Sequence, residues 1–186
     1  MKHTLDLEPE ENPFEDLALI LFHSSAPNYS FVDDLNHLYS LTLARKDDLI
    51  LSDFPFPLFS CCDTLRQLSY HLLERPSASA SQPLPSLWAP LHKLLIIQGE
   101  DAHRQADTIL AEFSLLPPAP SPDDLANFAR HQILANFHAA FTPVTLLDPN
   151  ASLPPDASRK TRREYADLQQ LLASILQQFD LHPTTT

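Results

Sequence analysis

The chain has 186 residues and a formal net charge of −12, and it holds one glycine, Gly99, against 18 prolines. Loops that cradle phosphate or present a nucleophile need glycine, so this composition excludes the GxGxxG turn, the GxxxxGK[ST] loop and the GxSxG elbow. The acidic balance argues against nucleic acid as the main partner, because phosphate binding needs an excess of Lys and Arg.

The first forty residues change from acidic to apolar. Residues 1–16 are polar and acidic and predict a flexible arm. The continuous apolar run over 17–23 (LALILFH) predicts a buried strand. A helix follows over 30–41, with Ser30 as its expected N-cap.

Two further strand-like segments come next. Residues 43–51 predict a strand with a charged centre, or a hairpin built on that centre. Residues 54–62 are extended by composition, and Pro55 and Pro57 confine the start of this segment to a sheet edge.

The middle of the chain contains one ambiguous segment and one clear one. The apolar spacing over 67–74 fits a helix and a strand equally well. Four prolines and four serines over 76–90 predict a linker or covering loop. Residues 91–98 (LHKLLIIQ) give the clearest strand signal in the chain.

Helices are predicted after Gly99. Residues 100–116 carry apolar side chains at alternating spacings of four and three. A second helix begins after Ser121, with a proline at its first position, and runs to about Phe141. The last helix spans about 160–181 and follows a proline-rich joint.

These elements together predict an α+β fold: a largely antiparallel sheet from residues 17–98 packed with helices, plus two additional C-terminal helices. The expected domains are an acidic flexible arm at 1–16, an α+β core at 17–147, a proline-rich joint at 148–158, and a C-terminal helix and tail at 159–186.

The order of several segments resembles that of the small bacterial proteins known by their IPExxxVDY signature. The resemblance covers about residues 14–150 and rests on short runs, chiefly Leu17–His23, Asp47-Asp48-Leu49 and Leu94–Glu100. Leu84-Pro85-Ser86 stands where Ile-Pro-Glu is expected. The resemblance implies a strand at 67–74, which we adopt, and it brings no known activity, cofactor or catalytic residue.

Three groups of side chains could carry chemistry. Asp33, Asp34 and His37 share one helical turn and could contribute to a metal site, and His103 with Asp107 could form an acid–base pair. The adjacent cysteines could supply a nucleophile, with His71 or His23 as its base. Capping, solvated helix faces and core packing explain the same residues more simply, so we expect no catalytic residue, cofactor or metal.

The last helix has a different character. Its apolar stripe has the spacing of a helix-pairing seam, and a basic cluster precedes it. We expect this helix either to bind a partner or a second copy, or to dock on its own sheet. The candidate partner-binding residues are Tyr165, Leu168, Leu172, Ile175, Phe179, Arg159, Arg162 and Arg163.

The sequence therefore predicts a non-catalytic cytoplasmic protein that acts by binding protein, as an adaptor or a homodimer. The adjacent pair Cys61 and Cys62 suits a reducing compartment, and no secretion signal or membrane helix is expected. The alternative is a small hydrolase using Asp/His or Cys chemistry.

Overall fold

The structure is a computed structural model that describes residues 14–23, 28–51, 54–74, 93–114, 120–121, 124–140, 142–147 and 153–181. The predicted arm up to residue 13, the loop at 76–90 and the first part of the joint lie outside the described residues.

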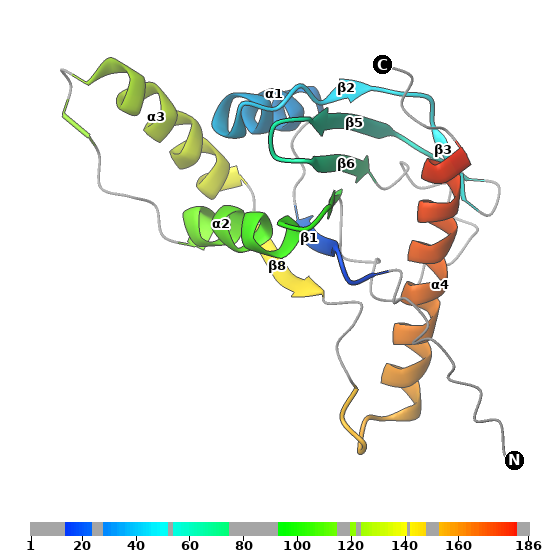
Figure 1. The fold of residues 1–186 in the computed structure, drawn as a ribbon. Helices are drawn as coiled ribbons and strands as arrows, with labels where there is room; N and C mark the ends of the chain where they lie inside the picture. Colours follow the sequence, from blue (N-terminus) through cyan, green and yellow to red (C-terminus); the bar gives the residue numbers. More distant parts are fainter. Residues whose placement is uncertain are drawn as a thin grey trace, which may run out of the picture.

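A six-stranded sheet in the order β2-β5-β6-β7-β1-β8 forms the centre of the protein (Figure 1). Every neighbouring pair of strands in it is antiparallel. Its strands are β1 (Leu17–His23), β2 (Ala44–Arg45), β5 (Leu58–Asp63), β6 (Leu68–Glu74), β7 (Lys93–Gln98) and β8 (Thr142–Leu147).

Both faces of this sheet are buried, each in its own apolar cluster. Along β1, Ala18, Ile20 and Phe22 belong to one cluster, and Leu19 and Leu21 belong to the other. Because successive side chains of a strand point to opposite faces, a strand buried on both sides is apolar throughout. The continuous apolar run of β1 has this cause.

Three helices cover the first face: α1 (Asn28–Tyr39), α2 (Ala102–Ser114) and α3 (Leu125–Ala140). The helix α2 buries Ala102, Ala106, Ile109 and Phe113, the positions that its apolar spacing predicts. The helix α3 lies against α1 and α2, and its described side chains add the buried Leu134 and the partly buried Ile133 to this cluster.

A polar network joins these three helices. Tyr39 of α1 donates a hydrogen bond to Glu112 of α2 (2.9 Å), and Arg130 of α3 pairs with the other carboxylate oxygen (2.6 Å). Arg130 also donates to the carbonyl oxygen of Leu38. This network ties α3 to α1 and α2.

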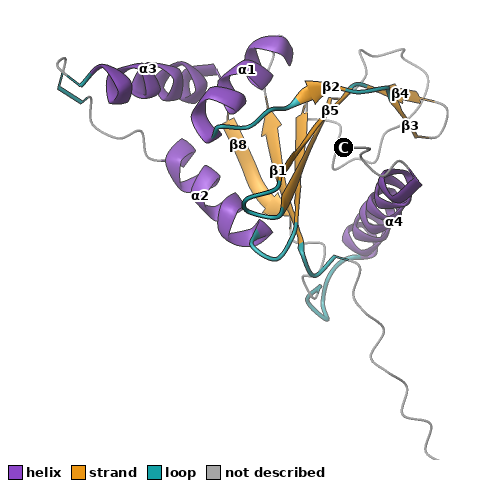
Figure 2. Cartoon of the chain, turned by 45° about the horizontal axis from the view of Figure 1, so that its top comes forward, coloured by secondary structure: helices purple, strands orange, loops and turns teal. Residues whose placement is uncertain are grey.

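The second face is covered by the last helix and a small hairpin. The helix α4 (Arg159–Leu181) and the two-stranded sheet of β3 (Leu49–Leu51) and β4 (Phe54–Phe56) lie on the side opposite α1, α2 and α3 (Figure 2). The second cluster joins Leu172 and Ile175 of α4 to strand residues such as Leu19 and Ile96.

The structure confirms the α+β class and the antiparallel sheet, and it makes 68–74 a strand. It also differs from the prediction in two places. Residues 43–51 form neither one strand nor a hairpin, because β2 pairs with β5 while β3 pairs with β4. The charged residues between them, with Arg45 paired to Asp48, redirect the chain from one sheet to the other.

The second difference is β8, which the sequence analysis did not predict. It adds an edge strand to β1, so the sheet includes residues beyond 98. Pro143 cannot donate a backbone hydrogen bond, which is tolerated in an edge strand such as β8.

The helix ends also differ slightly. The helix α1 begins at Asn28, so Ser30 lies inside it rather than at its N-cap. It ends at Tyr39 because Ser40 has a φ of 53°, a left-handed conformation that stops the helix. Asn36 then holds the departing chain, donating to the carbonyl of Leu43 (3.1 Å) and accepting from its N–H (2.8 Å).

Candidate functional site

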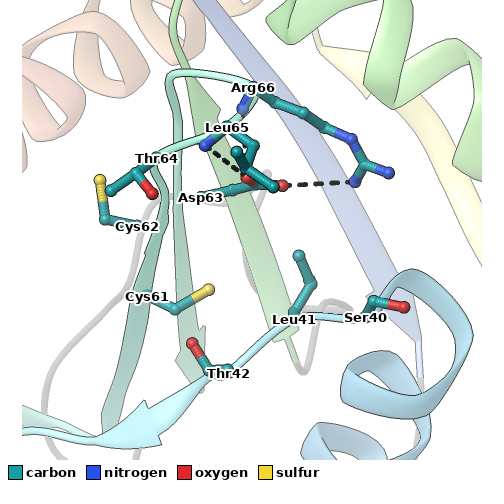
Figure 3. A pocket seen from close by; sticks show the side chains of 9 residues that line it. All are labelled: Ser40, Leu41, Thr42, Cys61, Cys62, Asp63, Thr64, Leu65 and Arg66. Carbon is teal, nitrogen blue, oxygen red and sulfur yellow. Dashed lines mark hydrogen bonds and ion pairs between the residues drawn. The ribbon is translucent and has the colours of Figure 1, made fainter.

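A pocket of about 280 Å³ lies beside the turn between β5 and β6 (Figure 3). It forms because β2 pairs with only the first part of β5, and the chain before it departs toward α1. Its walls come from two stretches, Ser40–Thr42 and Cys61–Arg66. The pocket combines hydroxyl and thiol groups with one ion pair, Asp63–Arg66 at 3.4 Å.

The thiol in this pocket is a poor nucleophile. Cys61 is half-buried and points toward Thr42, whereas Cys62 points away on the other side of β5 (Figure 3). Burial raises the pKa of the Cys61 thiol, and hydrogen bonds from Thr42 oppose this rise without cancelling it. A thiol with a raised pKa carries less of the reactive thiolate at neutral pH.

The structure does not bring Cys61 and His71 together, and Sγ of the exposed Cys62 lies 3.6 Å from the hydroxyl of Ser69. Cys61 pairs in register with Tyr70 and faces the first cluster, while His71, the next residue on β6, faces the opposite side of the sheet. His71 lies instead 2.9 Å from the hydroxyl of Ser60 through Nδ1, and both residues are buried. The side chain of His23 lies outside the described part.

Burial also makes His71 unsuitable as a base. It lowers the pKa of His71 from its ordinary 6.5 to about 4, so the ring is neutral at pH 7 and binds protons weakly.

The other predicted polar groups are placed as follows. Asp33 and His37 form an exposed pair at 3.5 Å on α1, and burial raises the pKa of the neighbouring Asp34 carboxyl. His103 lies 3.2 Å from the carbonyl oxygen of Glu15, which ties the start of α2 to the segment before β1. Within the described residues, no three His, Cys, Asp or Glu side chains converge as metal ligands would.

The candidate residues of α4 fall into three groups. Leu172 and Ile175 are fully buried in the second cluster, against the sheet of their own chain. Tyr165 is half-buried, and the side chains of Leu168 and Phe179 lie outside the described part. Docking on the sheet, one of the two alternatives for this helix, is the arrangement that the structure has.

The basic residues of α4 lie at its other end. Arg159, Lys160, Arg162 and Arg163 are exposed on the first two turns, and we call them the basic surface. In Figure 1 these turns extend past the sheet, away from the buried Leu172 and Ile175. They hold four of the twelve Lys and Arg residues of the chain.

The start of α4 is fixed by its own hydrogen bonds. The hydroxyl of Ser158 accepts a bond from the N–H of Thr161 (3.1 Å), as an N-cap does. Arg162 donates to the carbonyl oxygens of Pro155 (2.6 Å) and Ala157 (3.1 Å). Arg162 therefore has a structural role, whereas Arg159 and Arg163 are exposed on the same turns of the helix.

Cations are placed unfavourably at this end of a helix. The N-terminus carries the positive end of the helix dipole, and acidic residues are preferred there. The first turn of α4 has no acidic residue. Apart from the hydrogen bonds of Arg162, the positive charges of Arg159 and Arg163 lie where the helix dipole opposes them.

The sequence located the basic surface but not the pocket. The pocket depends on the left-handed backbone of Ser40 and on the shortness of β2. No sequence motif predicts either feature.

No family model, curated protein or solved structure matches the chain. The resemblance to the IPExxxVDY proteins stays a prediction. None of the helices in the described ranges is long and apolar enough to cross a membrane.

Proposed function

We propose that this chain is a non-catalytic cytoplasmic protein that binds another protein through the basic surface of α4. The partner contributes an acidic segment or surface. The observation that carries the proposal is the exposure of four cations on one helix end, in a chain whose net charge is −12.

Electrostatics supports this assignment in two ways. Arg159 and Arg163 lie where the helix dipole disfavours a positive charge, so their charge does not compensate the dipole. Complementary charges steer association and orient partners, which an isolated positive surface on an acidic protein does well.

The docking of α4 on the sheet also supports the assignment. Leu172 and Ile175 attach the helix to the sheet, and the hydrogen bonds of Ser158 and Arg162 fix its first turn. A rigid surface loses little conformational freedom when it binds. The apolar stripe acts as the anchor of the helix, so we place the contact on Arg159, Lys160 and Arg163 with Tyr165 at its border.

The hydrolase alternative receives no such support. The pocket thiol has a raised pKa, and the buried His71 lies on the other face of the sheet. The reducing compartment is consistent with the free thiols of Cys61 and Cys62.

Affinity capture from the native host tests the proposal. The tagged wild-type chain is compared with the Arg159→Glu/Arg163→Glu variant, and recovered proteins are quantified by isotope-labelled mass spectrometry. A matched control, Arg66→Glu/Arg104→Glu, reverses two exposed arginines elsewhere. Glutamate at a helix start favours the helix, so loss of binding cannot be ascribed to unfolding.

The proposal predicts at least one acidic protein that the wild type and the control recover and the variant does not. Equal recovery by all three chains contradicts it. Recovery of nucleic acid in place of protein, removed by the same variant, contradicts the protein partner.

A further inference from the structure

The chain carries a second cluster of charge that complements the basic surface. Residues 1–13 contain four carboxylates, at Asp6, Glu8, Glu10 and Glu11. The basic surface contains four cations over a similarly short stretch.

The fold brings the beginning of the described chain to the side of α4. Phe14 is buried in the second cluster with Leu172 and Ile175. Figures 1 and 2 both place the segment before β1 next to this helix. The acidic residues are therefore tethered to the face of the sheet that carries α4.

The tether has the required length. A helix rises 1.5 Å per residue, so Arg163 and Arg159 lie about 14 and 20 Å along α4 from Leu172. Extended chain covers up to about 3.4 Å per residue, so Glu11 and Asp6 can reach about 10 and 27 Å from Phe14. Asp6 can therefore reach the whole basic surface without any change in the described fold, and the carboxylates nearer to Phe14 reach progressively less of it.

We infer that the acidic segment Asp6–Glu11 binds the basic surface of its own chain. Tethering gives such a segment a high effective concentration at its target, so a modest attraction suffices. The contact weakens as salt screens it. This intramolecular contact goes beyond the proposed function, because it exists in the isolated chain without a partner. A partner that uses the same surface would have to displace the acidic segment.

Carbodiimide cross-linking of the dilute, isolated chain tests this contact. The reagent joins a nearby carboxylate to an amine as an amide, with the net loss of one water, and Lys160 is the amine within the basic surface. Peptide mass spectrometry is expected to find Lys160 joined to Glu8, Glu10 or Glu11. The Lys160→Arg variant keeps the charge and is expected to lose the product.

A second readout uses the ¹⁵N chemical shifts of the amides of residues 159–163. The triple variant Glu8→Gln/Glu10→Gln/Glu11→Gln is expected to shift them, as is high salt. A matched control, Asp33→Asn/Glu100→Gln/Asp107→Asn, removes three exposed charges on the opposite side of the sheet and is expected to leave them in place.

Three results would overturn the inference. The first is the absence of the Lys160 product together with ¹⁵N chemical shifts of residues 159–163 that are the same in the wild type and the triple variant. The second is equal shifts in the triple variant and its control. The third is a product that, in a mixture of isotope-labelled and unlabelled chains, joins two different molecules. Each result concerns the isolated chain, so it leaves the capture experiment unaffected.

Discussion

A β-carbon on Gly99 would lie 2.4 Å from the carbonyl oxygen of Gln67, a distance that real side chains do not adopt. Gly99 has a φ of +132°, and Gln67 has a φ of 54°. The only glycine of the chain stands where the end of β7 passes the turn between β5 and β6. In the sequence, Gly99 lies between the clearest predicted strand and the helix predicted over 100–116.

Gly99→Ala is expected to lower the free energy of unfolding by more than about 1 kcal/mol, because both the φ angle and the contact with Gln67 oppose a methyl group. Urea denaturation measures this loss. Gln67→Gly serves as the control: relief of the left-handed strain offsets the entropy that glycine adds to the unfolded chain, so little change is expected. An unchanged urea midpoint for Gly99→Ala would show that the backbone at Gly99 and Gln67 accommodates a methyl group without loss of stability.

The second prediction concerns pH. Burial gives His71 a folded pKa of about 4 against an ordinary 6.5, so the unfolded chain binds the extra proton between these values. The contribution of His71 is fully present above pH 6.5 and is lost as pH falls toward 4, a change of about 3 kcal/mol.

His71→Asn isolates this effect. Asparagine keeps a polar partner for Ser60 and does not titrate, and all other groups cancel in the difference between the two proteins. Between pH 8 and pH 4, chemical denaturation is expected to show a shallower loss of stability for the variant. If stability falls equally with pH in the wild type and the variant, protonation of His71 does not destabilise the folded protein.

The third prediction concerns the Tyr39–Glu112–Arg130 network. Glu112→Ala leaves a part-buried hydroxyl and guanidinium without their acceptor, which costs about 2 kcal/mol. Glu112→Gln keeps an acceptor but removes the charge, so a smaller loss is expected. In a double-mutant cycle with Arg130→Met, the two losses should add to more than the double variant shows. Strict additivity would indicate that the pair contributes no coupling.

The fourth prediction concerns the attachment of α4. Leu172→Ala removes a fully buried side chain and should cost about 3 kcal/mol. Gln170→Ala, on the exposed side of the same helix, should change stability by less than about 0.5 kcal/mol. Equal, small effects would show that α4 is only loosely attached and that its stripe is available to a partner.

The sequence predicted those strands and helices whose apolar residues form a recognisable run or spacing within a single segment. The apolar runs at 17–23 and 91–98 and the spacing within α2 require no knowledge of the rest of the chain. Segment 67–74 needed the resemblance, because leucines at these positions satisfy both periods. β8 was missed because a short run with a proline also fits the end of a helix.

Whether α4 docks on its own sheet or on a partner depends on long-range packing. An apolar stripe has the same spacing whether it docks on a sheet or on a partner, so periodicity cannot separate the two. One available signal was β1, which is apolar from Leu17 to Phe22 and therefore needs cover on both faces of the sheet. α1, α2 and α3 cover one face, and α4 supplies much of the second cover.

The most direct test of protein binding through the basic surface is a titration of the captured partner, in purified form, against the wild type and the Arg159→Glu/Arg163→Glu variant at two ionic strengths. Binding through the basic surface predicts that wild-type affinity falls as salt rises, that the variant binds at least about tenfold more weakly at low salt, and that this gap narrows at high salt. Equal affinities for the two chains, or a wild-type affinity independent of salt, would contradict it.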